Sequence, residues 1–146
     1  IKKKIIEFFK IELDKKIEFF KQAIDEAQKE AASYKGRMES RYDTFREEAQ
    51  AKRDDLKKQF FHIQNSLVII NEIPVEIIDV IKLGAIVETD KNNYFVSVGI
   101  LDAIEVGGKK YLPISLESPI GQVFFNKKYG DEIEFRGQKI KIRNVF

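Results

Sequence analysis

Apolar side chains recur every three or four positions near the start of the chain, which is the spacing of one face of an α-helix. The repeating positions are Ile5, Phe9, Leu13, Ile17, Phe20, Ile24, Ala27 and Ala31. A second run of the same kind comprises Tyr42, Phe45, Ala49, Leu56, Phe60, Ile63 and Leu67, with Lys52 or Arg53 at the one skipped place. Each predicted helix is roughly 40 to 50 Å long, so each needs a partner for its apolar stripe.

The apolar repeat is interrupted between these two runs, in the stretch SYKGRMESRYDTF. This stretch contains Gly36, the only glycine before Gly84. A glycine after an apolar repeat commonly ends a helix, because it adopts a left-handed backbone without a Cβ clash. The sequence therefore predicts a helical hairpin, with Ser40 capping the second helix. One alternative stays open: a continuous helix through Gly36 that pairs with a second chain, since glycine costs only about 1 kcal/mol inside a helix.

A reversal near residue 39 predicts which side chains of the two helices face each other. Phe19 and Phe20 would face Phe60 and Phe61 at the open end of the hairpin. Small residues would meet towards the turn, with Ala27, Ala31 and Ala32 against Ala49 and Ala51. The phenylalanine doublets make the stripe wider than a two-helix seam requires. We therefore expect the open end to pack against a further element.

In the second half of the chain, apolar and polar residues alternate, which is typical of β-strands. Two hairpins are predicted, GAIVETD with NYFVSV and ILDAIEV with KYLPISL, the latter turning at Gly107-Gly108. Two closing strands, EIEF and KIKIRNV, turn at Arg136-Gly137. Because all three connections are short and rich in turn residues, the strands are expected to form a small antiparallel sheet.

One short helix is predicted within this half, because Ser118 is a good N-cap and Pro119 a good first helical residue. The fold class is therefore α+β. An antiparallel α-helical hairpin is expected over residues 1–72, and a small sheet domain with one helix over residues 77–146. About 70 residues give a thin core, so packing against the base of the hairpin would stabilise this domain.

The charge pattern argues against general nucleic-acid binding. Lysine and arginine total 26 against 24 aspartate and glutamate, a formal net charge of +2, and no one-sided basic surface is evident. The absence of cysteine excludes disulfides and thiolate metal sites and fits a reducing compartment. Charges interrupt the opening IKKKIIEFFKIELDKK, so no signal peptide or membrane span is expected and a cytoplasmic location is predicted.

No motif of an enzyme active site is present in the sequence. It has no glycine-rich phosphate loop and no Ser-His-Asp or Cys-His set. His62 is the single histidine, and without a second histidine or a cysteine it is expected to pack or to lie at the surface. Intrinsic enzymatic activity and an intrinsic cofactor are therefore not expected.

The stretch ISLESPIGQVFFNKKYGDEIEF, residues 114–135, resembles the C-terminal domain of the Gre transcript-cleavage factors. The family pattern is an Ile-Ser strand, a Ser-Pro-Ile-Gly helix start, then Gly-Lys and Gly-Asp before an acidic and apolar strand. The matching positions are Ile114, Ser115, Ser118, Pro119, Ile120, Gly121, Lys127, Gly130 and Asp131. Asn126 departs from the pattern, because the family usually has glycine there. The long helical pair before this domain is also similar to the family layout.

The resemblance implies an antiparallel coiled coil followed by a domain of FKBP-like fold, and a monomer is expected. In the family the globular part docks on bacterial RNA polymerase, and the coiled coil enters the secondary channel. Acidic residues at its tip help to hold a second catalytic Mg²⁺, so that the polymerase cleaves backtracked RNA. The resemblance therefore implies RNA polymerase as the partner, indirect contact with nascent RNA, Mg²⁺ shared with the polymerase, and docking through Glu117, Ser118 and Pro119.

The predicted tip, residues 36–43, carries Glu39 and Asp43 four positions apart. On a helical turn their Cβ atoms lie about 5 to 6 Å apart, and carboxylate oxygens are ligands that Mg²⁺ takes. The family tip has Asp-Leu-Ser-Glu-Asn, whereas this chain has Met-Glu-Ser-Arg-Tyr-Asp. Three nearby arginines offer the carboxylates ion pairs instead. Metal binding and a solvated helix face both remain open.

Other functions also remain open at this point. The same hairpin could occupy the polymerase channel without donating metal ligands, and so modulate or inhibit transcription. The FKBP-like resemblance alone suggests a prolyl isomerase, which needs an aromatic-lined pocket, and this half has no tryptophan. The helices could form a dimerising coiled-coil scaffold. For Ser118 and Pro119, a purely structural role as a helix cap is the competing interpretation.

Overall fold

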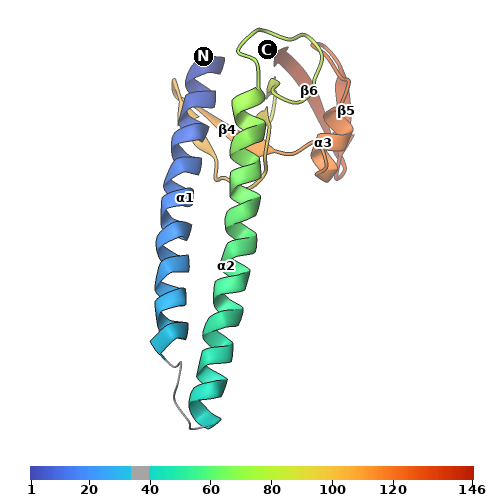
Figure 1. The fold of residues 1–146 in the computed structure, drawn as a ribbon. Helices are drawn as coiled ribbons and strands as arrows, with labels where there is room; N and C mark the ends of the chain where they lie inside the picture. The colour runs from blue at the N-terminus through green and yellow to red at the C-terminus, as the bar shows by residue number, and fades with distance from the viewer. Residues whose placement is uncertain (34–39) are drawn as a thin grey trace. The chain divides into compact units, whose positions relative to one another are not determined.

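The computed structural model describes the backbone of residues 1–33 and 40–146, and the side chains of residues 1–33 and 44–146. The helices of this part are α1 (Lys2–Ser33), α2 (Ser40–Glu72) and α3 (Pro119–Phe124) (Figure 1). The strands are β1 (Ile86–Thr89), β2 (Asn93–Val96), β3 (Ile104–Val106), β4 (Lys109–Ile114), β5 (Glu132–Phe135) and β6 (Gln138–Val145). The predicted α+β class is confirmed, with two long helices before a small sheet and one short helix.

The chain divides into two compact units. One comprises Leu13–Ser66, which is the greater part of α1 and α2. The other comprises Ile1–Glu12 together with Leu67–Phe146, so it joins the outer ends of the two long helices to the sheet. This division passes through both long helices, whereas the sequence suggested a boundary between residues 72 and 77.

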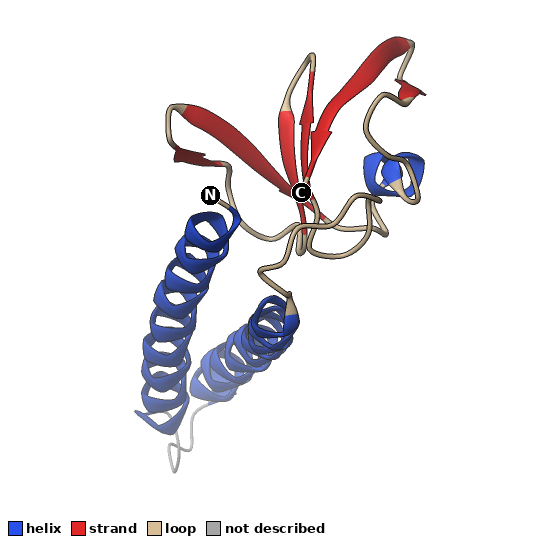
Figure 2. Cartoon of the chain, turned by 90° about the horizontal axis from the view of Figure 1, so that it is seen from above, coloured by secondary structure: helices blue, strands red, loops and turns tan. Residues whose placement is uncertain are grey.

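In the unit Leu13–Ser66, α1 and α2 lie side by side and run in opposite directions (Figures 1 and 2). The predicted helical hairpin is confirmed, and a continuous helix is wrong, because α1 ends at Ser33 and a separate helix begins at Ser40. Gly36 and the side chain of Ser40 lie outside the described residues. The buried or partly buried stripe residues of this unit are Leu13, Ile17, Phe20, Ile24, Ala27, Ala31, Ala49, Leu56, Phe60 and Ile63.

Only one phenylalanine of each adjacent pair in this unit is partly buried. Phe20 and Phe60 are half-buried, whereas Phe19 is 65% and Phe61 64% exposed. The prediction that both pairs meet is wrong for Phe19 and Phe61. Consecutive helical residues point about 100° apart, so one neighbouring helix covers only one of them. Phe19 instead packs edge-on against Phe20, with ring centroids 5.4 Å apart.

The smaller stripe residues are divided in the same way. Ala27, Ala31 and Ala49 are buried, as predicted. Ala32 and Ala51 are exposed, and Phe45 is 47% exposed, so the prediction that they lie in the seam is wrong. The seam towards the turn is therefore narrower than the full set of apolar positions indicates, because only residues spaced by three or four positions share the helix face that meets the neighbouring helix.

The second unit contains a six-stranded sheet in the order β3-β4-β2-β1-β6-β5. The three predicted hairpins are present as the antiparallel pairs β1–β2, β3–β4 and β5–β6, and β1 also pairs antiparallel with β6. The β2–β4 pair is parallel, which departs from the purely antiparallel sheet that was expected. The cause is topological: β3 forms the sheet edge and turns back into β4, so β4 runs in the direction of β2.

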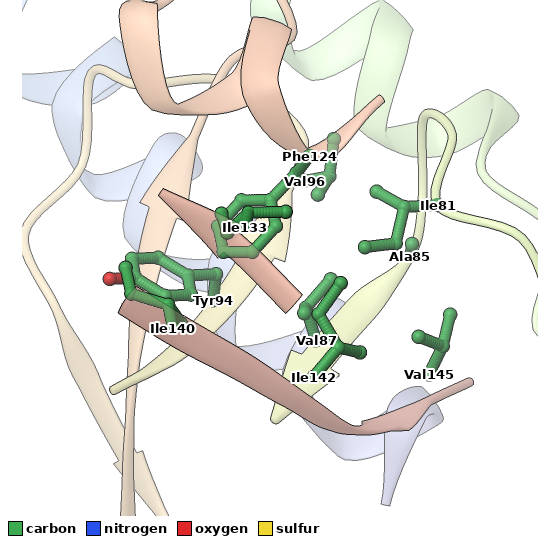
Figure 3. Packing of buried hydrophobic residues seen from close by; sticks show 10 residues of the cluster. All are labelled: Ile81, Ala85, Val87, Tyr94, Val96, Phe124, Ile133, Ile140, Ile142 and Val145. Carbon is green, nitrogen blue, oxygen red and sulfur yellow. The ribbon is translucent and has the colours of Figure 1, made fainter. Parts of the chain in front are cut away.

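One face of the sheet packs with α3 around a buried apolar cluster (Figure 3). Its members are Ile81, Ala85, Val87, Tyr94, Val96, Phe124, Ile133, Ile140, Ile142 and Val145. Phe124 is the α3 residue in this core, and its ring centroid lies 5.2 Å from that of Tyr94. Because strand residues alternate in direction, Phe95 faces the other side of the sheet.

The opposite face of the sheet packs against the first turns of α1. The fully buried ring of Phe9 lies 5.0 Å from the ring of Phe95, centroid to centroid. Lys2 is only 4% exposed, and its Nζ donates a hydrogen bond to the Glu76 carbonyl at 2.8 Å. The expectation that the open end of the hairpin packs against a further element is confirmed, and these contacts explain why residues 1–12 group with the sheet.

Candidate partner-binding surface

Two serines build the turn in which α3 begins. The Ser118 hydroxyl accepts a hydrogen bond from the Gly121 N–H at 3.1 Å and donates one to the Ser115 carbonyl at 2.6 Å. Ser115 Oγ accepts a further bond from the Ser118 N–H at 3.2 Å. Pro119 follows at the first helical position, where it has no N–H to satisfy. The predicted cap is confirmed, and Ser118 has a structural role in it.

Gly121 lies so close to the preceding strand end that no side chain fits there. A Cβ on Gly121 would lie 2.0 Å from the Ser115 carbonyl oxygen and 2.9 Å from the Leu116 Cα. Both neighbours are backbone atoms, which cannot move aside as the end of a flexible side chain can. The Ser-Pro-Ile-Gly motif is therefore explained by the geometry of the turn, whatever else its residues contact.

The segment after α3 also depends on special backbone geometry. Asn126 has a φ of 64°, in the left-handed region that glycine adopts freely and asparagine tolerates better than most residues. This explains how asparagine stands where the resembled family usually has glycine. Gly130 has a φ of 87°, and the Asp131 carboxylate accepts a hydrogen bond from the Lys128 N–H at 2.9 Å. The later motif positions thus also shape a turn.

Several side chains around α3 are left exposed by this turn. They are Glu117, Pro119, Gln122, Phe125 and Tyr129, and they are termed the α3 surface. Of the predicted docking residues, Glu117 and Pro119 belong to it, while Ser118 is half-buried and bonded within the cap. The Gln122 amide donates a hydrogen bond to the Glu117 carbonyl at 3.1 Å. Exposed aromatic side chains beside polar ones are typical of protein interfaces.

Sequence reasoning missed two residues of the α3 surface, Phe125 and Tyr129. Phe125 is 46% and Tyr129 72% exposed, while the neighbouring Phe124 is fully buried. The available signal was the Phe-Phe doublet itself. A six-residue helix that packs on a sheet by one face buries only one of two adjacent aromatic residues, so the other must lie at the surface.

The predicted metal-binding carboxylates cannot be placed as side chains. Glu39 lies outside the described residues, and Asp43 lies in α2 with its side chain outside the described part. Among the described residues, no group of three or more His, Cys, Asp or Glu side chains could hold a metal ion. His62 is exposed, which is one of the two locations expected for it. No helix in the described ranges is long and apolar enough to cross a membrane.

Comparison with known proteins gives a likeness to solved structures only. No family model and no curated protein matches the chain. The GreA factor homolog 1 (Gfh1) of Thermus thermophilus is 16% identical, with 94% of each chain covered and a TM-score of 0.37. Gfh1 of Thermus aquaticus is 16% identical, with 92% of this chain and 91% of that chain covered and a TM-score of 0.35. Such identities and TM-scores carry no functional conclusion, so function must be argued from the residues of this chain.

Proposed function

We propose that the protein regulates transcription elongation by binding RNA polymerase, in the manner of the Gre factors that its sequence resembles. One observation carries the proposal: a single chain joins an antiparallel helical hairpin to a sheet domain in which the Ser115–Gly121 turn caps α3. The helices have 32 and 33 residues, so each is about 50 Å long at 1.5 Å per residue, a length suited to insertion into a deep channel.

In this proposal the two units have different tasks. The α3 surface docks on the polymerase, because it presents Glu117, Phe125 and Tyr129 to solvent beside a turn fixed by the hydrogen bonds of Ser115 and Ser118. The hairpin enters the secondary channel and brings Glu39 and Asp43 towards the catalytic metal. Two carboxylates can complete the shell of a Mg²⁺ that is otherwise held by the polymerase, water and phosphate oxygens. The protein itself is an accessory factor rather than an enzyme.

Docking is tested by measuring polymerase binding with purified protein and core polymerase. Tyr129→Ala and Glu117→Ala should each weaken binding, and the aromatic truncation should cost more because exposed tyrosines are frequent hot spots. Lys139→Ala is the matched control, since Lys139 is also exposed but lies on β6. Equal binding by all four proteins would exclude the α3 surface as the docking site.

Metal delivery is tested on stalled, backtracked elongation complexes by the appearance of short RNA products. Glu39→Ala and Asp43→Ala should reduce cleavage, whereas the control Glu48→Ala removes an exposed carboxylate further along α2 and should not. Cleavage that survives both tip variants would overturn the assignment of the metal ligands. Tight binding without any cleavage would instead favour the second candidate, a polymerase-binding modulator, which the arginines around the tip carboxylates also support.

A further inference from the structure

A row of polar residues crosses the sheet on the face opposite α3. Glu88 on β1 lies directly opposite Asn93 on β2 and Asn144 on β6. Asn93 in turn is in register with Tyr111 on β4. Residues directly opposite one another project on the same face of a sheet, and Val87, the neighbour of Glu88, belongs to the core on the α3 side. This face therefore changes from apolar at Phe95 to polar at Glu88.

Glu88 organises this polar area without leaving a free negative charge. Its Oε2 accepts a hydrogen bond from the Lys109 Nζ at 2.6 Å, and its Oε1 accepts one from the Asn144 amide at 3.4 Å. Only 14% of its side chain is exposed. The hydrogen bond and the charge of Glu88 raise the pKa of Lys109, so Lys109 stays a cation at neutral pH.

Two surface hollows border this area and share Asn93 and Lys109. One has a volume of about 390 Å³ and is lined by Glu88, Thr89, Asn93, Lys109, Arg143 and Asn144. The other has a volume of about 330 Å³ and is lined by Lys91, Asn92, Asn93, Gly108, Lys109, Lys110 and Leu112. Together they are termed the β-face hollow. Its charged lining residues are Glu88 and the basic Lys91, Lys109 and Arg143, together with Lys110, whose side chain projects on the α3 face because it alternates with that of Tyr111 along β4.

A local irregularity of β6 places one of the cations at this hollow. Glu88 pairs with Asn144 and Thr89 pairs with Ile142, so Arg143 is the extra residue of a bulge. A bulge re-aims the side chain that it carries, and Arg143 lines the hollow with an exposed side chain. Within the described part of the chain, neither Arg143 nor Lys91 has an ion-pair partner. These two cations are available to a ligand.

A buried hydroxyl lies on the same face of the sheet as Asn93 and Lys109. Tyr111 is fully buried, and its hydroxyl has no hydrogen-bond partner among the described residues. Tyr111 is in register with Asn93, which in turn lies opposite Glu88. Burial, and secondarily the charge of Glu88, raise the pKa of Tyr111, so the hydroxyl keeps its proton and remains a donor. A buried donor without a partner is uncommon and costs stability.

We infer that the β-face hollow binds a compact phosphate-bearing anion. Lysine and arginine cations with several amide donors are the groups that recognise phosphate oxygens. The anion would be held by Arg143 and Lys91 at the rim, with the side-chain amides of Asn93 and Asn144 as further donors. It would compete with Glu88 for Lys109.

The surrounding charges favour a compact ligand over a long polyanion. Beyond the hollow on the same face of the sheet, basic and acidic residues lie opposite each other, Glu134 with Lys139 and Glu132 with Lys141. A nucleic-acid strand that extended past the hollow would meet these carboxylates and gain little from counterion release. The positive excess is confined to an area the size of one or two phosphate groups, and this inference does not depend on the proposed role in transcription.

The test is a titration of the full ¹⁵N-labelled chain with sodium pyrophosphate, followed by amide chemical shifts at constant ionic strength. Saturable shifts are expected for residues 88–93, 108–111 and 143–145, with a fitted Kd. Arg143→Gln should weaken binding at least about fivefold, in line with loss of one charge-assisted contact. Lys139→Gln, the same loss of charge on the same strand, should leave the Kd unchanged.

Glu88→Gln should change the affinity for pyrophosphate in the opposite direction. It removes the charge that competes for Lys109 and keeps one amide oxygen that can still accept the Lys109 hydrogen bond, so pyrophosphate should bind more tightly by at least about threefold. Non-saturable shifts, or equal Kd values for Arg143→Gln and Lys139→Gln, would overturn the inference. So would a single-stranded RNA oligonucleotide that binds more tightly than pyrophosphate and shifts amides beyond the hollow. A dispersed amide spectrum confirms folding of each variant, and Lys91→Gln replaces Arg143→Gln if the latter fails to fold.

Discussion

Replacing Phe9 with alanine should remove the contact that joins the start of α1 to the sheet. The Phe9 side chain is fully buried and packs on Phe95. Truncation of a buried phenylalanine costs about 3–5 kcal/mol, and burial of roughly 150–200 Å² at about 25 cal/mol per Å² gives a similar value. The higher helix propensity of alanine offsets about 0.5 kcal/mol of this loss in the free energy of unfolding. The net loss in the free energy of unfolding is therefore about 3–4 kcal/mol.

Phe8→Ala is the matched control, because Phe8 precedes Phe9 on the same helix and is 46% exposed. Its truncation should cost less than about 1 kcal/mol. Urea unfolding measured by far-UV circular dichroism reports the helices, and tyrosine fluorescence reports mainly the sheet unit, which holds Tyr94, Tyr111 and Tyr129. Equal losses in the two variants would refute the packing of α1 on the sheet.

Three further predictions concern single positions in the sheet unit. Gly121→Ala should lower the free energy of unfolding, measured by urea titration, by about 1–3 kcal/mol or more, because the new Cβ would overlap with backbone atoms. Gly99→Ala is the control and should lower it less, since its Cβ would lie 3.8 Å from the nearest atom. Asn126→Gly should change the free energy of unfolding by less than about 0.5 kcal/mol. Asn126→Val should lower it by about 1–2 kcal/mol, because a β-branched residue is disfavoured in the left-handed backbone conformation. Similar thermal unfolding midpoints for the two variants would contradict this prediction. Burial lowers the pKa of Lys2, against a smaller opposite effect of Glu76, so the charged form is disfavoured in the folded state. This lowers the free energy of unfolding at neutral pH, and the loss disappears as the pH rises towards 10.5, where the lysine becomes neutral. The wild-type protein should therefore gain stability relative to Lys2→Met as the pH is raised in that range. A stability difference between the two proteins that does not change with pH would show that the ammonium group is not desolvated.

The elements could be predicted from the sequence because their signals are local. The helical spacing of apolar residues predicts α1 and α2, and the turn residues predict the three hairpins. Ser118 followed by Pro119 predicts the start of α3. Each of these depends on residues within a few positions of one another. The two long helices, the hairpins and the cap are accordingly confirmed.

Pairings between distant segments could not be predicted in this way. Nothing in the alternation of β2 and β4 shows that they pair in parallel, since both orientations bury the same residues. Likewise the stripe of α1 showed a surplus of phenylalanine but not that Phe9 would pack on Phe95. The β-face hollow was missed for the same reason, because its cations come from β4, β6 and the turn after β1.

The geometry of α3 decides which variants can inform on docking. Ser118 and Gly121 are required by the turn itself, one through its hydrogen bonds and the other through its lack of a Cβ. A loss of polymerase binding after substitution of either residue would therefore report a distorted turn rather than a lost contact. Tyr129 is 72% exposed, so its truncation leaves the turn intact. A binding defect in Tyr129→Ala with unchanged unfolding would identify an interface, because the two quantities would then move independently.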